Sequence, residues 1–126
     1  MYGAHVGGRA VRSVFSAPRI GYARVTGPAT MWGLGGSASL RDRTLTLTVV
    51  NPHISEPSAA EIVVRAATVK TVRAAVIAAA DIHAHNTFDR PDTVRQRETP
   101  AGPASGATLA HTFPPASVTR LTMDLV

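Results

Sequence analysis

Hydrophobic and polar side chains alternate most strictly over residues 43–50. Three apolar residues share one parity and three threonines the other, namely Leu45, Leu47 and Val49 against Thr44, Thr46 and Thr48. A period of two places them on opposite faces of a β-strand, and β-branched threonines favour that conformation. The pattern predicts a strand with one buried face and one solvent-exposed face. Asn51-Pro52 should end it, because proline cannot continue the hydrogen-bond ladder.

Weaker alternation predicts further strands along the chain. Residues 60–66, 69–78, 107–113 and 120–125 each alternate, although the alanines of residues 69–78 leave a helix as an alternative. Pro114-Pro115 predicts a tight connection between the last two strands. Residues 11–15 also alternate, and Arg41-Asp42-Arg43 is typical of a hairpin turn leading into the strand at residues 43–50.

Several short strands, even turn spacing and no long amphipathic helix indicate an all-β fold. We expect an antiparallel two-sheet β-sandwich, similar to a jelly roll. Two Gly- and Pro-rich segments, residues 17–36 and 90–106, interrupt the pattern and are predicted to be loops.

The length and composition limit the class of protein. A chain of 126 residues forms one domain and is too short for a (β/α)₈ barrel, which needs about 250 residues. It has no cysteine, so we expect no disulfide and, by default, the reducing cytoplasm. The longest run of small apolar residues, 74–80, is too short to span a membrane, and no secretory segment is evident.

The net charge of +5 raises the question of nucleic-acid binding. The arginines are dispersed from Arg9 to Arg120, without a basic cluster or interleaved aromatic residues. We therefore expect no nucleic-acid partner.

The eight carboxylates show no catalytic pattern, although glycosidases need two of them on either side of one bond. They fall in expected turns, loops and polar strand faces, where solvated charge is the usual role. No nucleophile elbow, phosphate loop or dinucleotide fingerprint is present either. We expect no catalytic residue and no cofactor.

The segment from Asp81 to Asp89 has two histidines spaced by two, His83 and His85, between two aspartates. On a strand both imidazoles would share a face and could bind zinc with a carboxylate. No further metal-binding pattern supports this, so no metal is expected. The alternative is a structural loop whose side chains satisfy buried backbone groups.

The same segment carries a resemblance to a known family. Residues 80–92, Ala-Asp-Ile-His-Ala-His-Asn-Thr-Phe-Asp-Arg-Pro-Asp, resemble the N-A-H-N-T-F-(D/E)-x-P-(D/E) segment of family 51 α-L-arabinofuranosidases. Other pieces follow the family order: the opening Met-Tyr-Gly-Ala-His, Leu-Thr-Leu-Thr-Val-Val-Asn at residues 45–51, and Phe-Pro-Pro-Ala-Ser-Val at residues 113–118. The resemblance covers nearly the whole chain.

The resemblance implies a two-part enzyme that removes terminal α-L-arabinofuranosyl groups with retention. Its (β/α)₈ barrel carries both catalytic glutamates, and a C-terminal β-sandwich follows. Neither glutamate motif occurs here, so this chain alone is expected to be inactive and to be a fragment or separately encoded remnant. Residues 1–30 would be the segment leaving the barrel with the first strands, and residues 31–126 the sandwich.

Three roles remain open. The leading one is an accessory domain that packs on a barrel and supports oligomer contacts, with an interdomain or structural motif formed by His83, His85, Asn86, Thr87, Phe88 and Asp89. The second is a carbohydrate-binding module that contacts arabinose-containing saccharides through Trp32 and Tyr22. The third is an independent enzyme.

Overall fold

The computed structural model describes all of residues 1–126 as β-strands and loops, with one short 3-10 helix and no α-helix. The elements in chain order are η1 (Tyr2–His5), β1 (Arg9–Val11), β2 (Ile20–Arg24), β3 (Gly27–Met31), β4 (Gly35–Arg41), β5 (Thr44–Asn51), β6 (Ser58–Val63), β7 (Val69–Ile77), β8 (Arg97–Thr99), β9 (Ala104–Ser105), β10 (Thr108–Phe113) and β11 (Ser117–Leu125).

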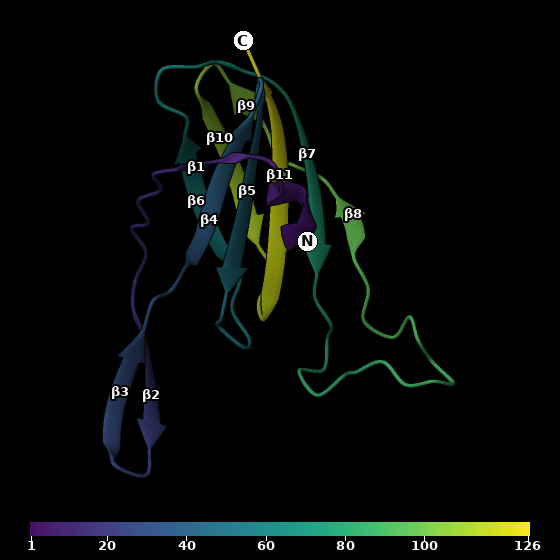
Figure 1. The fold of residues 1–126 in the computed structure, drawn as a ribbon. Coiled ribbons are helices and arrows are strands. Elements are labelled where there is room, and N and C mark those ends of the chain that lie inside the picture. The colour runs from purple at the N-terminus through teal and green to yellow at the C-terminus, as the bar shows by residue number, and fades with distance from the viewer.

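Two antiparallel sheets face each other and form a sandwich (Figure 1). One sheet has six strands in the order β1-β4-β5-β11-β7-β8, and the other has three in the order β6-β10-β9. Strands β2 and β3 form a separate ribbon that extends beyond the sandwich. The predicted all-β, antiparallel sandwich is confirmed, and residues 69–77 form a strand, not the alternative helix.

The turns explain how the chain moves between strands. Asp42 adopts φ 53° in the tight β4–β5 turn, a left-handed conformation that aspartate tolerates better than most residues. After β10, Pro114-Pro115 carries the chain from the three-stranded sheet into β11 of the six-stranded sheet. The core lies between the two sheets and includes Leu109, Phe113, Leu121, Met123 and Val49.

The threonine face of β5 corrects one prediction. Leu45, Leu47 and Val49 point into the core as expected, but Thr46 and Thr48 on the other face are also buried. The helix η1 lies over this part of the sheet, where His5 Nε2 is 2.8 Å from Thr48 Oγ1. Local alternation of side chains cannot predict this burial, because the covering residue His5 is 43 residues from Thr48 in the sequence.

Three loop or strand predictions were wrong in part. Residues 17–36 contain the β2–β3 hairpin and the start of β4, and residues 90–106 contain the short strands β8 and β9. Conversely, β1 ends at Val11, so residues 12–15 are not a strand. These strands are short or lie at edges, where little burial accompanies the pairing and the hydrophobic alternation is weak.

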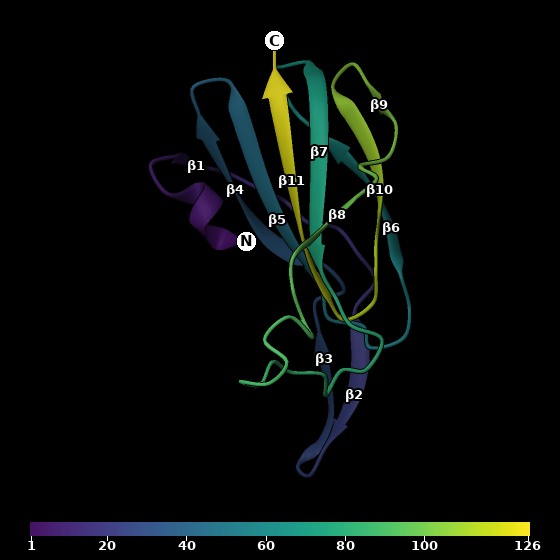
Figure 2. The same ribbon diagram turned by 90° about the vertical axis from the view of Figure 1, so that its right-hand side faces the viewer.

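Two projections leave the sandwich at one end. The β2–β3 ribbon and the long connection between β7 and β8 both extend from the end opposite the C-terminus (Figures 1 and 2). No helix of the chain is both long and apolar enough to cross a bilayer.

Candidate docking surface

The outward face of the six-stranded sheet changes from apolar to polar along its length. Register places Val50, Val118 and Ile77 side by side on β5, β11 and β7, all half-buried. The next row on the same face is Thr48, Arg120 and Ala75, followed by Thr46, Thr122 and Arg73, and then by Thr44, Asp124 and Thr71. This face therefore has an apolar row at one end of the strands and polar rows along the rest.

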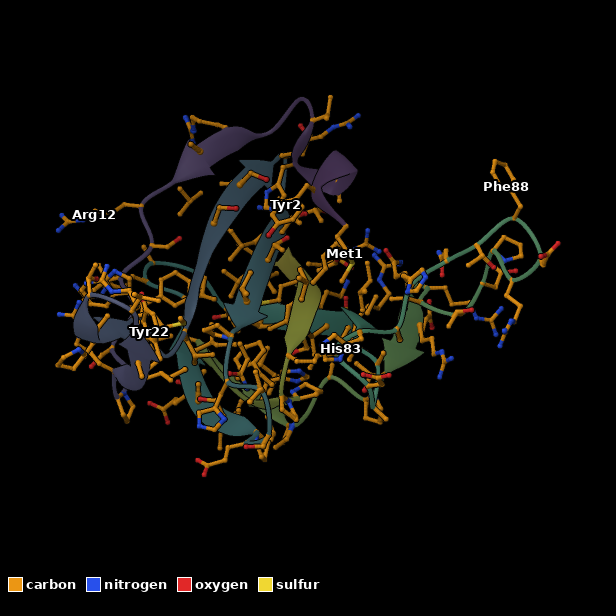
Figure 3. All side chains as sticks on the ribbon, turned by 90° about the horizontal axis from the view of Figure 1, so that it is seen from below. Met1, Tyr2, Arg12, Tyr22, His83 and Phe88 are labelled. Atoms are coloured by element: carbon orange, nitrogen blue, oxygen red, sulfur yellow. The ribbon has the colours of Figure 1, made fainter.

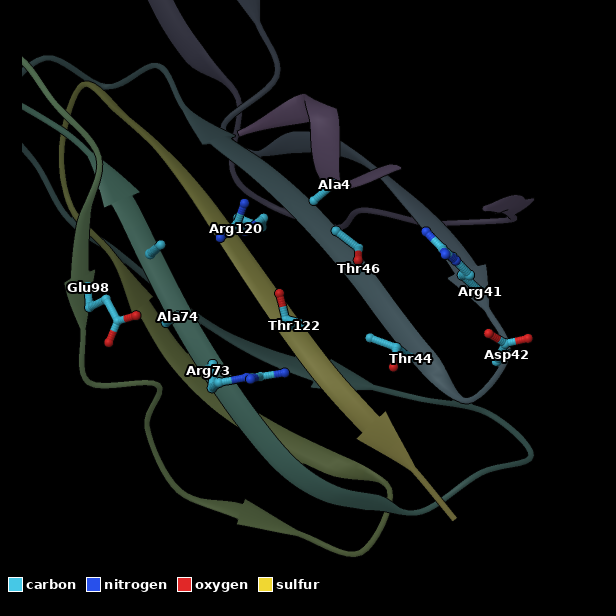
Figure 4. Close-up of a pocket in the computed structure, with 11 residues that line it drawn as sticks. Ala4, Arg41, Asp42, Thr44, Thr46, Arg73, Ala74, Glu98, Arg120 and Thr122 are labelled. Carbon is cyan, nitrogen blue, oxygen red and sulfur yellow. The ribbon is translucent and has the colours of Figure 1, made fainter. Parts of the chain in front are cut away.

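A groove of about 500 Å³ crosses the polar part of this face (Figure 4). Three arginines line it, Arg41, Arg73 and Arg120, together with Thr46 and Thr122 from the central strands. The acidic residues Asp42 and Glu98 stand at its opposite sides. The groove therefore presents mainly donors, with carboxylates only at its margins.

Asp124 is held beside this groove by two threonines. Thr71 Oγ1 donates to its carboxylate at 2.6 Å and Thr44 Oγ1 at 3.2 Å. These hydrogen bonds, with a smaller contribution from the Arg73 guanidinium at 3.9 Å, lower the pKa of Asp124 because they favour its ionised form. Asp124 and Arg73 thus form a partnered pair at the sheet surface.

The helix η1 borders the same face. Both ring nitrogens of His5 have hydroxyl partners, with Nδ1 2.7 Å from Ser39 Oγ and Nε2 2.8 Å from Thr48 Oγ1. One nitrogen donates and the other accepts, according to the tautomer. This single side chain therefore fastens the first residues of the chain to β4 and β5, and leaves Tyr2 half exposed beside them.

The β7–β8 connection is ordered by its own polar side chains. Asn86 closes residues 86–94 with two bonds to Val94, Nδ2 donating to its carbonyl at 2.9 Å and Oδ1 accepting from its N–H at 2.7 Å. Backbone bonds in both directions between Thr87 and Arg90 form a tight turn, and Thr87 Oγ1 accepts the Arg90 N–H at 3.1 Å. The turn displays Phe88, whose side chain is completely exposed (Figure 3).

The structure places the predicted motif of residues 83–89 at the surface. Its His85, Asn86 and Thr87 side chains bond backbone groups, and all of these bonds are at the exposed surface. His83 Nδ1 lies 3.2 Å from Asp81 Oδ1, and His85 Nδ1 donates to the His83 carbonyl. No group of three or more His, Cys, Asp or Glu side chains in the chain could hold a metal ion.

The loop and η1 lie on the same side of the molecule. In Figure 2 both extend beyond the outward face of the six-stranded sheet, away from β6, β9 and β10. We define the docking surface as this face with its two borders: the row of Val50, Val118 and Ile77, the groove at Arg120, the helix η1, and the loop carrying Ile82 and Phe88.

The two candidate sugar contacts lie at the β2–β3 ribbon, Tyr22 within β2 and Trp32 directly after the end of β3, and point to different sides. Tyr22 shares a face with Ala29 and Met31, so alternation turns Trp32, the next residue, toward the other face. There the Arg19 guanidinium lies 4.6 Å from the centre of the Trp32 ring. The two aromatic rings are exposed, but they do not form one platform.

Sequence reasoning missed His5 and Arg120. His5 was only part of a family motif, and nothing nearby in the sequence indicates its partners in β4 and β5. Arg120 was one of many dispersed arginines, and only the pairing of β11 with β5 and β7 places it in the middle of a sheet. The available signal was its position in an alternating strand between Thr119 and Leu121.

Comparison with solved structures shows the same fold in larger proteins. A family 51 α-L-arabinofuranosidase from Bifidobacterium longum superposes with a TM-score of 0.78 at 19% identity, over 97% of this chain and 24% of that one. The family 51 enzyme of Xanthomonas axonopodis pv. citri gives 0.76 at 18% identity, over 85% and 21%. The α-L-arabinofuranosidase of Thermotoga maritima gives 0.75 at 19% identity, over 96% and 27%.

The present chain therefore spans about a quarter of the length of these proteins. No curated protein matches it. At the level of sequence, the model of the α-L-arabinofuranosidase C-terminal domain matches residues 1–117. Because that match covers almost the entire chain, the chain belongs to the α-L-arabinofuranosidase C-terminal domain family.

Proposed function

We propose that this domain is the non-catalytic accessory part of an α-L-arabinofuranosidase and that its docking surface packs against the catalytic (β/α)₈ barrel. The observation that carries the proposal is Phe88, a completely exposed aromatic side chain on a loop ordered by internal hydrogen bonds. Displaying a large apolar side chain on an ordered turn is favourable where a partner buries it.

The composition of the rest of the surface supports the same role. The half-buried row of Val50, Val118 and Ile77 can supply an apolar centre, while the groove supplies a polar rim. The related enzymes also have about three-quarters or more of their chains outside the matching region. A large body is thus available to cover this face in proteins of that kind.

The groove does not suit glycoside hydrolysis by this chain. A retaining glycosidase needs two carboxyl groups about 5–5.5 Å apart. Asp42 lies next to β5 and Glu98 lies on β8, three strand spacings away, which is about 14 Å across the sheet. We therefore assign the removal of terminal α-L-arabinofuranosyl groups with retention to the barrel of the whole enzyme.

Three further points belong to the same proposal. The enzyme is located in the cytoplasm, the domain supports contacts between copies of the enzyme, and residues 1–30 form the segment that leaves the barrel.

The test is complex formation between this chain and a family 51 catalytic barrel from the same genome, produced without its own sandwich. We expect a one-to-one complex in sedimentation velocity, and at least a tenfold weaker one with Phe88→Ser, because an aromatic anchor carries much of an interface. Val63→Ser is the matched control, since Val63 is exposed on the opposite sheet. The docking role would be contradicted if the barrel formed no complex with the chain, or if the two variants changed the affinity equally.

Catalysis is tested separately with the chain alone and a chromogenic arabinofuranoside. We expect no turnover above buffer. Measurable hydrolysis that is lost in Glu98→Gln would make the chain an enzyme and would overturn the accessory assignment.

A carbohydrate-binding role is the second candidate, because Trp32 is exposed and Arg19 already orders one face of its ring. Titration calorimetry with arabinan and arabinoxylan oligosaccharides, with Trp32→Ala and Tyr22→Ala as variants, tests it. Binding that disappears in Trp32→Ala would establish this role, whereas flat heats with the unmodified chain would eliminate it.

A further inference from the structure

Arg120 is the one groove arginine that lies in the middle of the sheet. It stands on β11 between Thr48 on β5 and Ala75 on β7, and it is half-buried. Its Nε is shielded from solvent and has no hydrogen-bond partner. The ion pairs of the chain are His53–Glu56, Arg73–Asp124 and His83–Asp81, so Arg120 has no carboxylate partner.

The neighbouring arginines are in different situations. Arg73 already pairs with Asp124, and its side chain is largely exposed. Arg41 lies at the exposed end of the groove, beside the β4–β5 turn. Small side chains lie next to Arg120 instead: Ala75 is its partner on β7, Thr122 is two residues along β11, and both line the same groove (Figure 4).

Covering this face would make an unpaired Arg120 costly. It follows directly after the apolar row of Val50, Val118 and Ile77, which is part of the docking surface. A partner seated on that row would remove water from the guanidinium, and a desolvated charge without a counter-charge is strongly unfavourable. The planar guanidinium matches a carboxylate in two parallel hydrogen bonds.

We propose that Arg120 binds the carboxylate of an aspartate or glutamate side chain of the docked barrel. This inference rests on the docking function proposed above and names the chemistry of the partner at its centre. Arg73 and Asp124 stay paired with each other, and Arg120 supplies the free positive charge.

The first test uses the isolated chain and sodium acetate as a carboxylate probe, compared with sodium chloride at equal ionic strength. The ¹⁵N–¹H signal of Arg120 Nε, assigned by its loss in Arg120→Lys, should move saturably with acetate and not with chloride. The signal of Arg12, outside the groove, should not move saturably. In Glu98→Gln the acetate affinity should rise a few-fold, because a competing negative charge leaves the groove. An Arg120 signal that is indifferent to acetate would overturn the inference.

The second test measures affinity for the barrel. Arg120→Gln should weaken the complex at least tenfold and Arg120→Lys less, whereas Arg12→Gln should leave the affinity within about twofold. A complex that forms with equal affinity in Arg120→Gln would refute this inference and leave the docking function standing. The absence of any complex would instead refute the docking function itself.

Discussion

Asn51 shows how one buried polar side chain joins three segments. It is 1% exposed, and its Nδ2 donates to the carbonyls of Glu56, Phe113 and Pro114 at 3.0–3.1 Å. Its Oδ1 accepts the N–H of His53 at 3.0 Å. The end of β5, the following loop and the β10–β11 connection therefore meet at a single amide, whose two N–H groups are shared among three carbonyls while its oxygen accepts one N–H.

Replacing Asn51 with leucine should destabilise the domain by about 2–4 kcal/mol, because carbonyls and an N–H would remain buried without partners. Urea unfolding followed by far-ultraviolet circular dichroism measures the change. Asn86→Leu is the matched control: Asn86 also makes side-chain bonds, but at the exposed surface. We expect less than about 1 kcal/mol there, since water replaces the lost partners. Equal losses in both variants would refute the argument from burial.

Asp124 gives the domain a pH dependence with a definite sign. Its pKa is lower in the folded state, mainly through the Thr71 hydroxyl. A lowered pKa contributes stability above the unfolded value of about 3.9, and that contribution is lost as pH falls through the folded value. The stability difference between the unmodified chain and Asp124→Asn should therefore be present at pH 7 and shrink below about pH 4. Thr71→Val should reduce the same difference, as measured by thermal unfolding across pH. A difference independent of pH would contradict this assignment.

Among the elements, η1 is held against the sheet by the side chain of one histidine. It has no buried residue, and His5 supplies two side-chain bonds to the sheet. His5→Ala should release residues 1–8 without unfolding the sandwich, which hydrogen exchange would detect as faster exchange of the Gly8 amide, whose N–H now bonds the His5 carbonyl. His85→Ala is the control at an exposed position. Unchanged exchange at Gly8 in His5→Ala would show that the backbone alone holds η1.

The strands that the sequence predicted are those with a buried face. In β5, β7, β10 and β11, side chains of one parity enter the core, so the period of two is visible in the sequence. The β2–β3 ribbon lies outside the sandwich and buries little, which leaves no hydrophobic alternation to detect. Gly33 at its base is buried, and a Cβ there would collide with the Pro18 carbonyl oxygen, so close backbone packing explains that glycine.

At the scale of the whole molecule, stability depends on contact between the sheets. Phe113 is 1% exposed and meets His111 edge-on, with ring centroids 4.8 Å apart. Phe113→Ala should cost about 3–5 kcal/mol through lost burial and the resulting cavity. That is a large share of the 5–15 kcal/mol typical of a domain. Phe88→Ala makes the same chemical change at a completely exposed site and should leave the urea midpoint unchanged. A comparable loss in Phe88→Ala would mean that the loop packs on the sandwich.

The features of this protein that could be predicted in advance are the local ones. Alternation in β5 and β11, proline at strand ends and Asp42 in a turn act within a few residues, so they specify strands, turns and the sandwich class. The motif at residues 80–92 also indicated the family correctly.

The surfaces that these elements form could be recognised only after folding had brought distant segments together. The strand order places β11, and with it Arg120, between β5 and β7. The long-range hydrogen bonds of His5 hold η1 over threonines that were predicted to face solvent. The turn at Thr87 and Arg90 leaves Phe88 in solvent, although its hydrophobicity alone would suggest burial. Each of these outcomes depends on which distant residues pack together or on whether a side chain is left in solvent. A local sequence pattern contains no information about either.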